Sequence, residues 1–512
     1  MVNNKPSGKA GSIEGGMFKN IDFTSLKTIM IVAGFFRILA ALFSQGYGMH
    51  DDHFLIIEAS ASWVDGYDYN NWLPWNKPEG AVPEGHSFTY VGLNFIFFYI
   101  LKGIGLTDPK MLMVLNRLLH GLFSLLTVYF GYKITTKIST KENATIVGWF
   151  LAILWIFPFM AVRNLVEITC MPFIMWSLWL YVKSNTNKDL ILSGILMGLA
   201  VSFRYQIGVF AIGLALHLLI RKDWKPFLLF CSGVLLLFVF TQGLVDYLIW
   251  GYPFAEMLSY VLYNMDEGTR YMPNANSFMY IEVLMGIMLV PLGLAMGLGY
   301  FRSAKKYAFM FLPSLLFLLF HSFYPSKQER FILPILPVFI MLGVLGYHTL
   351  RNKKGWNKFW KISMKAFWVL NIPLLLMASV TYSKKSRVEA MYFFYENNLR
   401  PKYILTEGSG RGKTSMFPKF YSGKWDVVFA NTTVLDSNVD VSHDYIIFSD
   451  LDLLESRVQF YKETFPNMER IEICDPSFAD KVVKWINPVN RNEYFEIWAT
   501  NTKASQTKKT SK

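Results

Sequence analysis

Apolar stretches long enough to cross a lipid bilayer recur along the first three quarters of this chain, and they limit its fold more than any other feature. A helix needs about 20 consecutive apolar residues to cross the hydrocarbon layer. Composition agrees, because only 17% of the residues are charged, whereas about a quarter are charged in a soluble protein. The sequence therefore predicts a polytopic α-helical membrane protein. We expect about 11 transmembrane helices, at residues 28–45, 112–132, 144–158, 166–182, 190–203, 206–220, 227–249, 278–300, 307–323, 331–348 and 362–382.

A twelfth apolar stretch, residues 90–106, contains three glycines and Lys102. The positions of Lys and Arg decide whether it crosses, because short cytosolic loops carry an excess of these residues. If residues 90–106 do not cross, the cytosolic segments hold twenty Lys and Arg and the short outside loops hold five. A crossing there would reverse this asymmetry. We therefore predict a re-entrant or interfacial helix at residues 90–106.

This topology divides the chain into four parts. Residues 1–27 form a cytosolic tail, residues 28–383 form the transmembrane domain, and residues 46–111 are a long extracytoplasmic loop with juxtamembrane helices. Residues 384–502 alternate β-rich runs, at 426–430, 445–448, 469–474 and 493–499, with a helix-like stretch at 453–465, which predicts a small extracytoplasmic α/β domain. Residues 503–512 are polar and predicted to be disordered. The protein is thus expected in a bacterial inner membrane or the endoplasmic reticulum membrane.

The net charge of +13 does not indicate nucleic-acid binding. The Lys and Arg residues form short clusters between apolar windows, and this pattern suits anionic lipid headgroups rather than a polynucleotide. We therefore expect membrane lipids as partners and no nucleic acid.

Ionisable residues directly follow the first predicted crossing. They are His50, Asp51, Asp52 and His53, with Glu58 shortly after them. A carboxylate near a membrane is costly, since desolvation raises its pKa, and such groups are commonly functional. This predicts a catalytic site at Asp51 and Asp52, with a solvated loop start as the alternative. We expect no cofactor, but imidazole and carboxylate side chains at residues 50–53 also suit a divalent metal.

A second polar cluster, Ser326 to Phe331, lies in an outside turn before a crossing that contains Pro334 and Pro337. Arg binds phosphate as a fork and Lys binds it as a point charge. Lys327, Arg330 and Arg204 are therefore candidates for holding the phosphate of a lipid. The alternative is that these cations only extend from the ends of the crossings to lipid headgroups.

The remaining candidates for substrate binding are His86, Arg163, His321 and Glu329. Arg163 and Glu167 lie four residues apart, so they are also expected to pair on one helix face without a role in chemistry.

Two segments of the predicted α/β domain resemble motifs that bind nucleotides or nucleotide sugars, but neither meets the requirements of its motif. Residues 408–414 resemble a phosphate-binding loop, but Glu407 stands where the motif requires glycine. Asp450 and Asp452 resemble a metal-binding pair, but their position before residues 453–465 is typical of a helix cap.

The order of these features is similar to that in glycosyltransferase family 22, the mannosyltransferases of the GT-C superfamily. That family has Pro-Asp-Glu after the first span, with a Glu seven residues beyond the Asp; here the residues are His50, Asp51, Asp52 and Glu58. Its later motif, His-Lys-Glu-Glu-Arg-Phe followed by prolines, is matched at 326–331 with Ser326 and Gln328 as departures. The matches at 87–90, 116–118, 163–164 and 246–251 lie between them, and the resemblance covers about residues 25–350.

This resemblance implies a GT-C fold and an inverting transfer of a sugar, most often mannose, from a polyprenyl- or dolichyl-phosphate donor to a hydroxyl of a glycan or glycolipid. By analogy Asp51 is the base, Asp52 and Glu58 orient the acceptor or the base, and Lys327 and Arg330 hold the lipid phosphate.

Other functions remain open from the sequence. A transporter or flippase of a charged lipid or solute would place ionisable groups near the midplane of the membrane, often in repeated halves, and no repeat is visible here. A non-catalytic scaffold that uses the outside domain is a third possibility, and a GT-C enzyme with another lipid-linked sugar is a fourth.

Overall fold

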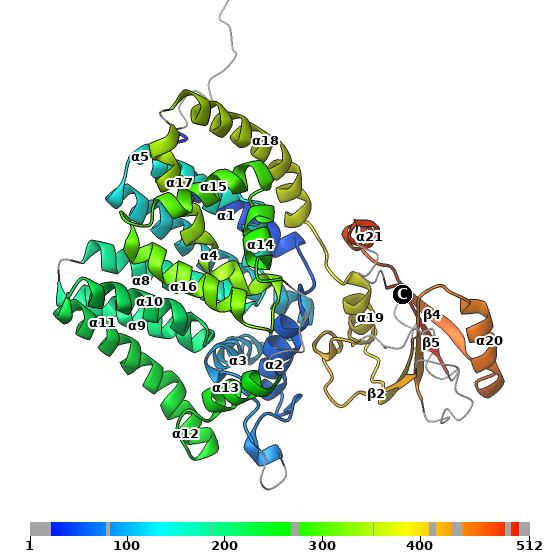
Figure 1. The fold of residues 1–512 in the computed structure, drawn as a ribbon. Helices are drawn as coiled ribbons and strands as arrows, with labels where there is room; N and C mark the ends of the chain where they lie inside the picture. Colours follow the sequence, from blue (N-terminus) through cyan, green and yellow to red (C-terminus); the bar gives the residue numbers. More distant parts are fainter. Residues whose placement is uncertain are drawn as a thin grey trace, which may run out of the picture.

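The computed structural model describes residues 22–77, 82–184, 186–267, 276–351, 353–408, 416–432, 443–486 and 493–500. A large helical bundle carries a smaller sheet domain at one end (Figure 1). Three predicted features lie mostly or wholly outside the described residues: the cytosolic tail at 1–27, the disordered tail at 503–512, and the segment at 408–414 that resembles a phosphate-binding loop.

The bundle contains long helices separated by short ones. In chain order they are α1 (Leu26–Phe43), η1 (Asp52–Glu58), α2 (Ala59–Val64), η2 (Pro74–Asn76), α3 (Phe88–Gly103), α4 (Pro109–Ile138), α5 (Lys141–Ile153), α6 (Ile156–Ala161), α7 (Val166–Thr169), α8 (Met171–Lys183), α9 (Asn187–Phe203), α10 (Ile207–Ile220), α11 (Trp224–Phe238), η3 (Val239–Leu244), α12 (Val245–Trp250), α13 (Ala255–Glu267), α14 (Met279–Ile287), α15 (Val290–Arg302), α16 (Ala308–Phe323), η4 (Glu329–Ile335), α17 (Leu336–Arg351) and α18 (Lys354–Ser379).

Every predicted crossing coincides with one of these helices or with two or three consecutive ones. Within the described ranges, five helical stretches are long and apolar enough to span a membrane alone: α1, α4, Trp224–Trp250, Glu329–Arg351 and α18. A bent pair, α14 and α15, would make a sixth. The protein is therefore a helical membrane protein with several spans, and the number of 11 crossings stays a prediction.

The predicted crossing at residues 278–300 is not one straight helix. The helical direction bends by 117° between α14 and α15. Leu289, between them, has a positive φ of 54°, and Pro291 in the first turn of α15 has no N–H to continue the hydrogen bonding of α14. The apolar pattern predicted the helices, but the break depends on these two residues.

Helix α3 covers most of the apolar stretch that we predicted not to cross. It is a 16-residue helix that packs on α2 and η1. In Figure 1 it is viewed nearly along its axis, whereas α9 and α11 run across the picture. This orientation agrees with an interfacial helix.

Helix α17 is the central helix of the bundle and continues from η4, which carries Arg330. Its side chains are almost all buried. It lies so close to α15 that a Cβ built on Gly346 would stand 1.8 Å from the carbonyl oxygen of Gly299. Small residues allow such close contacts between helices in membranes, so this contact holds α17 against α15.

The C-terminal part forms the α/β domain that the alternating pattern predicts. Its elements are α19 (Lys385–Glu396), β1 (Tyr403–Glu407), η5 (Lys419–Ser422), β2 (Val428–Thr432), β3 (Tyr445–Ser449), α20 (Leu454–Thr464), β4 (Glu469–Cys474), α21 (Phe478–Ile486) and β5 (Phe495–Ala499). The strand order is β2-β1-β3-β5-β4. Strand β1 is parallel to β2 and β3, with Ile404 opposite Tyr445, while β5 is antiparallel to β3 and β4.

Four of the five strands lie where the β-rich runs predict them, and β1 was not predicted. Helix α20 also occupies the predicted region. Its start differs from the prediction, because Leu453 with a φ of 49° takes the N-cap position without a side-chain cap. Instead, Arg457 donates hydrogen bonds to the carbonyl oxygens of Ser449, Asp450 and Asp452.

The sheet domain contacts the long loop that follows α1. Phe420 in η5 donates its backbone N–H to Glu58 of η1 at 3.0 Å, and the indole of Trp425 donates to Asp65 at 2.7 Å. Lys110 pairs with Glu389 of α19 at 2.9 Å. Buried apolar residues of the bundle and of the near face of the sheet form one continuous cluster.

Candidate active site

A cavity of about 650 Å³ lies where several helices of the bundle end. Its wall is formed by η1, residues 85–87, residues 164–167 before and in α7, residues 203–206 between α9 and α10, α13, the end of α16, and residues 324–326, 328, 330 and 331. Since helix ends leave backbone groups and polar side chains unpaired, such a place collects groups that can bind a ligand.

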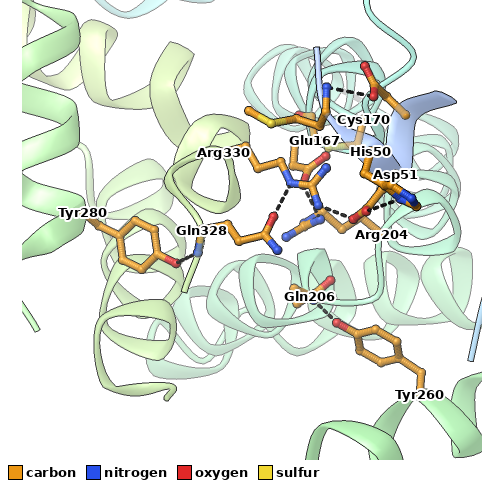
Figure 2. Close-up of polar contacts among 12 residues, drawn as sticks. His50, Asp51, Glu167, Cys170, Arg204, Gln206, Tyr260, Tyr280, Gln328 and Arg330 are labelled. Carbon is orange, nitrogen blue, oxygen red and sulfur yellow. Dashed lines mark hydrogen bonds and ion pairs between the residues drawn. The ribbon is translucent and has the colours of Figure 1, made fainter. Parts of the chain in front are cut away.

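Four ionisable side chains in this wall form one chain of contacts (Figure 2). Arg330 pairs with Asp51, and its Nε lies 3.4 Å from Oε1 of Glu167. Arg204 donates from Nη1 to the same Glu167 oxygen at 2.8 Å. Both arginines and Glu167 are buried, while 46% of the Asp51 side chain is exposed. Two buried cations therefore share one buried carboxylate, and Asp51 is the member that faces the cavity opening.

Asp51 is held as a carboxylate. Burial raises the pKa of Asp51, but hydrogen bonds and positive charge from His50 and Arg330 outweigh burial, and the pKa is well below its usual range. The ionised form can accept a proton, as a base must.

Asp52 is buried and held by the backbone. It accepts hydrogen bonds from the N–H groups of Gly48 at 3.1 Å and Met49 at 2.9 Å, and burial raises its pKa. Arg163 lies behind it, outside the cavity wall, and donates to the carbonyl oxygen of Ser44 at 2.8 Å. Contrary to the expected pairing, Arg163 does not contact Glu167, because α6 ends at Ala161 and α7 begins only at Val166.

Arg204 and His321 line the cavity, and each has at least one buried nitrogen atom without a hydrogen-bond partner among the described residues. Nε and Nη2 of Arg204 are buried and have no partner among the described residues, and the guanidinium lies 4.7 Å above the Phe331 ring. His321 uses Nδ1 on the carbonyl oxygen of Phe317 at 2.9 Å, and within the described chain its Nε2 has no partner. Nε and Nη2 of Arg204 are donors and favour an anion. Nδ1 of His321 donates to a carbonyl, so Nε2 of the neutral ring is an acceptor and favours a hydroxyl.

His86 also lines the cavity. Its ring stacks on Trp72 with 4.5 Å between centroids, and its backbone N–H donates to Glu256 of α13 at 2.9 Å. Glu256 also accepts from Gly85 at 2.7 Å and from Trp250 at 2.8 Å. Burial raises the pKa of Glu256 to about 7 although these hydrogen bonds lower it. Glu256 thus fixes the loop that positions His86.

The structure does not bring all predicted site residues together. Asp51, Asp52, His86, Arg204, His321 and Arg330 line the cavity, whereas Glu58, Arg163, Lys327 and Glu329 lie outside its wall. Glu58 faces η5 and contacts His53 at 3.2 Å. Lys327 donates to the carbonyl oxygen of Tyr324 at 2.8 Å, and Glu329 is exposed. The chemical role of each residue stays a prediction.

The four residues considered for a metal point to different partners. Nε2 of His50 lies 3.1 Å from the Met416 sulfur, and His53 contacts Glu58. In the described part of the chain, no three His, Cys, Asp or Glu side chains are grouped as metal ligands. Arg330 supplies positive charge beside Asp51.

Sequence reasoning missed several residues of the wall. Glu167 was assigned only to Arg163, yet it organises both arginines. Gln206 contacts the Tyr260 hydroxyl, and Gln328 accepts from Arg330 at 2.8 Å (Figure 2). The sequence did hold a signal for Glu167, which is a carboxylate at the start of an apolar stretch. Because residues 162–165 are not helical, Arg163 is not its partner.

Comparison with known proteins identifies the family. The model of the Alg9-like mannosyltransferase family matches residues 28–406. A curated relative, GPI mannosyltransferase 3 from Yarrowia lipolytica, is 22% identical over 324 residues, and the match covers 61% of each chain. The chain thus spans about three fifths of that relative's length.

Solved structures share the fold. ArnT from Cupriavidus metallidurans, solved with bound undecaprenyl phosphate, aligns with a TM-score of 0.59 at 12% identity, covering 93% of this chain and 98% of ArnT. The oligosaccharyltransferase of Archaeoglobus fulgidus aligns with a TM-score of 0.52 at 12% identity, covering 85% of this chain and 69% of that one. These likenesses agree with the GT-C fold that the sequence predicts. With a family model that matches most of its length, the chain belongs to the Alg9-like mannosyltransferase family.

Proposed function

We propose that this protein transfers a mannosyl residue from a polyprenyl- or dolichyl-phosphate donor to a hydroxyl of a glycan or glycolipid. The observation that carries the proposal is the ionised Asp51 at a cavity wall that also holds buried arginines, in a chain of a mannosyltransferase family. ArnT, which shares the fold, was solved with a polyprenyl phosphate.

In the proposed reaction Asp51 takes the proton of the acceptor hydroxyl. The acceptor oxygen forms a bond to the anomeric carbon from the face opposite the phosphate, so the configuration inverts. The bond between that carbon and the phosphate oxygen breaks, and the phosphate leaves with the electron pair. One base is sufficient for this displacement, and Asp52 beside it orients Asp51 or the acceptor.

The leaving phosphate is proposed to lie against Arg204 and Arg330. Nε and Nη2 of Arg204 are buried donors without a partner among the described residues, so they can bind it, whereas Nε2 of His321 can accept from a sugar hydroxyl. Arg330 would leave its ion pair with Asp51 and bind the phosphate. Without Arg330 beside it, Asp51 would have a higher pKa and be a stronger base when the donor is bound. Donors placed where charge develops stabilise the transition state by about 3 kcal/mol each.

The cavity and the sheet domain are proposed to lie on the extracytoplasmic side. The excess of Lys and Arg in the other loops supports this orientation. The domain is tied to the loop after α1 by Glu58, Asp65 and Lys110, so both belong on one side of the membrane. The bacterial inner membrane and the endoplasmic reticulum membrane both offer such a face.

Transport is less well supported than transfer. The ionisable groups of the cavity lie at ends of helices, since Asp51 precedes η1, Arg204 is the C-cap of α9 and Arg330 is the second residue of η4. Transporters instead place such groups near the midplane of the membrane.

The test is transfer of radiolabelled sugar in membranes that contain the full chain, compared with membranes that lack it. Polyprenyl-phosphate mannose is expected to label a lipid-linked acceptor only when the protein is present. Transfer from another lipid-phosphate sugar in the same panel, but not from the mannose donor, would support the alternative GT-C activity. Movement of labelled donor across sealed vesicles without transfer would support a flippase.

Replacing Glu167 by Gln is expected to weaken donor binding, because Arg204 and Arg330 would lose the charge that holds them. Loss of charge from a buried hydrogen-bonded pair costs about 2 kcal/mol or more, so kcat/KM for the donor should fall on the order of 30-fold. Steady-state kinetics measure this, and a rise in donor KM at constant acceptor KM would identify a positioning role. A Glu167→Asp variant should recover part of the loss, and a loss of melting temperature without a change in KM would contradict the prediction.

Chelation with EDTA is expected to leave the transfer rate unchanged, because we propose that arginines rather than a metal neutralise the phosphate. The rate is measured before and after chelation, and again after Mg²⁺ or Mn²⁺ is added. A loss of activity that a divalent cation restores would show that the transfer needs a metal.

A further inference from the structure

Helix α21 on the sheet domain exposes its apolar side chains. Phe478 is 76% exposed, Trp485 is 83% exposed and Ile486 is 71% exposed, and none of the nine residues of this helix is buried. With 100° between residues, Phe478, Val482, Trp485 and Ile486 share one side. Lys481, Lys484 and Asp480 occupy the other side. The helix is therefore amphipathic with its apolar face turned away from the protein.

The polar side attaches the helix to the point where the chain leaves the bundle. Asp480 accepts hydrogen bonds from the backbone N–H of Lys384 at 3.3 Å and from the Ser477 hydroxyl at 2.8 Å. Lys384 lies five residues after Ser379, the last residue of α18, which is long and apolar enough to span a membrane. In Figure 1, α21 lies at the edge of the domain next to the end of α18, and α20 lies at the opposite edge.

This position sets the level of α21 relative to the bilayer. The end of a spanning helix lies in the headgroup region, and a segment hydrogen-bonded five residues beyond it lies close to the same level. Leu376 and Val380 at the end of α18 are themselves half exposed, as residues that face lipid are. Apolar side chains at this depth meet acyl chains rather than water.

The residue types match such a location. Trp is enriched where a membrane meets water, and short amphipathic helices with Lys on the polar face lie in this plane with the apolar face in lipid. The ammonium groups of Lys481 and Lys484 are then near the headgroup phosphates. A soluble domain would bury the same apolar face, because large exposed apolar patches promote association.

We propose that α21 is an interfacial anchor whose apolar face lies in the membrane that α18 crosses. The partner is the lipid surface beside the protein's own bundle. The inference uses the position and polarity of α21 and does not depend on the transfer reaction.

The test places a fluorophore on α21 in the full chain, reconstituted in phospholipid nanodiscs. Trp485→Cys carries the label in a chain with Cys231→Ser, since Cys170 and Cys474 are buried and Cys231 is the half-buried cysteine. Leu453→Cys is the matched control, because Leu453 is a 79% exposed apolar residue beside α20 on the opposite edge of the domain. Quenching is measured with lipids that carry a nitroxide near the headgroup, and separately with iodide in the water.

The label at residue 485 is expected to be quenched by the nitroxide lipid about threefold more than the label at residue 453, and by iodide correspondingly less. Equal quenching of both labels by iodide would overturn the proposal. Protection that appears only in discs with two copies of the protein would also overturn it, because a second copy would then cover α21. These readouts require no substrate, so failure of the proposed transfer activity does not affect them.

Discussion

Replacement of Asp51 by Asn should lower the rate of mannosyl transfer by roughly a thousandfold, which lies within the range of a lost general base. Asn has the same shape as Asp but cannot take the proton of the acceptor hydroxyl. The rate is measured as labelled mannose transferred from lipid-phosphate mannose, in membranes with matched amounts of each protein. Because 46% of the Asp51 side chain is exposed, the amide should be accommodated without loss of the fold.

The matched control for this variant is Glu84→Gln. Glu84 is a carboxylate of the same long loop, half exposed and paired with Lys77 at 2.8 Å, and it does not line the cavity. Its variant should transfer at the wild-type rate and melt at the wild-type temperature. If Asp51→Asn is as active as Glu84→Gln, Asp51 is not the base.

Replacement of Arg204 by Met should lower kcat/KM for the donor on the order of 100-fold, because two buried nitrogen donors and one charge would be removed from the leaving phosphate. Met fills the space of the arginine stem, and its apolar side chain can still pack on Phe331. Glu167 keeps Arg330 at 3.4 Å as a charged partner. Kinetics with varied donor concentration measure the loss.

Two further variants show whether the loss in Arg204→Met comes from the phosphate site. Arg204→Lys keeps the charge but not the fork, so its activity should lie between those of wild type and Arg204→Met. Arg221→Met changes an arginine that is 62% exposed and paired with Asp223, and it should not change transfer. Donor kinetics of Arg204→Met that equal those of Arg221→Met would remove Arg204 from the phosphate site.

The helices at the predicted crossings were predictable because each depends on a local run of apolar residues, and the strands β2 to β5 were predictable from β-rich runs between polar segments. Helices α13, α19 and α21 were not predicted. The bend between α14 and α15 was not predictable, because the mean hydropathy of residues 278–300 is insensitive to the backbone at Leu289 and Pro291. Strand β1 was missed although it lies at an inner position of the sheet, between β2 and β3.

Two neighbouring members of the cavity network were each visible in the sequence. Asp51 and Arg330 stood out because charged groups beside a membrane are costly, but 279 residues separate them, and no local rule pairs them. The expected pair of Arg163 and Glu167 failed because the four-residue rule applies only within a continuous helix, and residues 162–165 are not helical.

Glu58 matches the family motif by its spacing from Asp51, yet its side chain does not line the cavity. That match implied a role in orienting the acceptor or the base. In the fold, η1 directs Asp52 toward the cavity and Glu58 toward Phe420. That contact depends on a domain more than 300 residues along the chain, so the motif alone could not reveal it.

The continuous apolar cluster that joins the bundle and the sheet has a consequence for truncation. Phe98 of α3 packs on Phe420 with 5.7 Å between ring centroids, and the His53 ring stacks on Tyr421 at 5.6 Å. A chain ending after α18 would expose these rings and leave Glu58 without its backbone donor. Independent domains have cores of their own, whereas here a single cooperative unit includes η1, α3 and η5. Shortening the protein to its membrane helices would therefore also loosen η1, the segment next to Asp51.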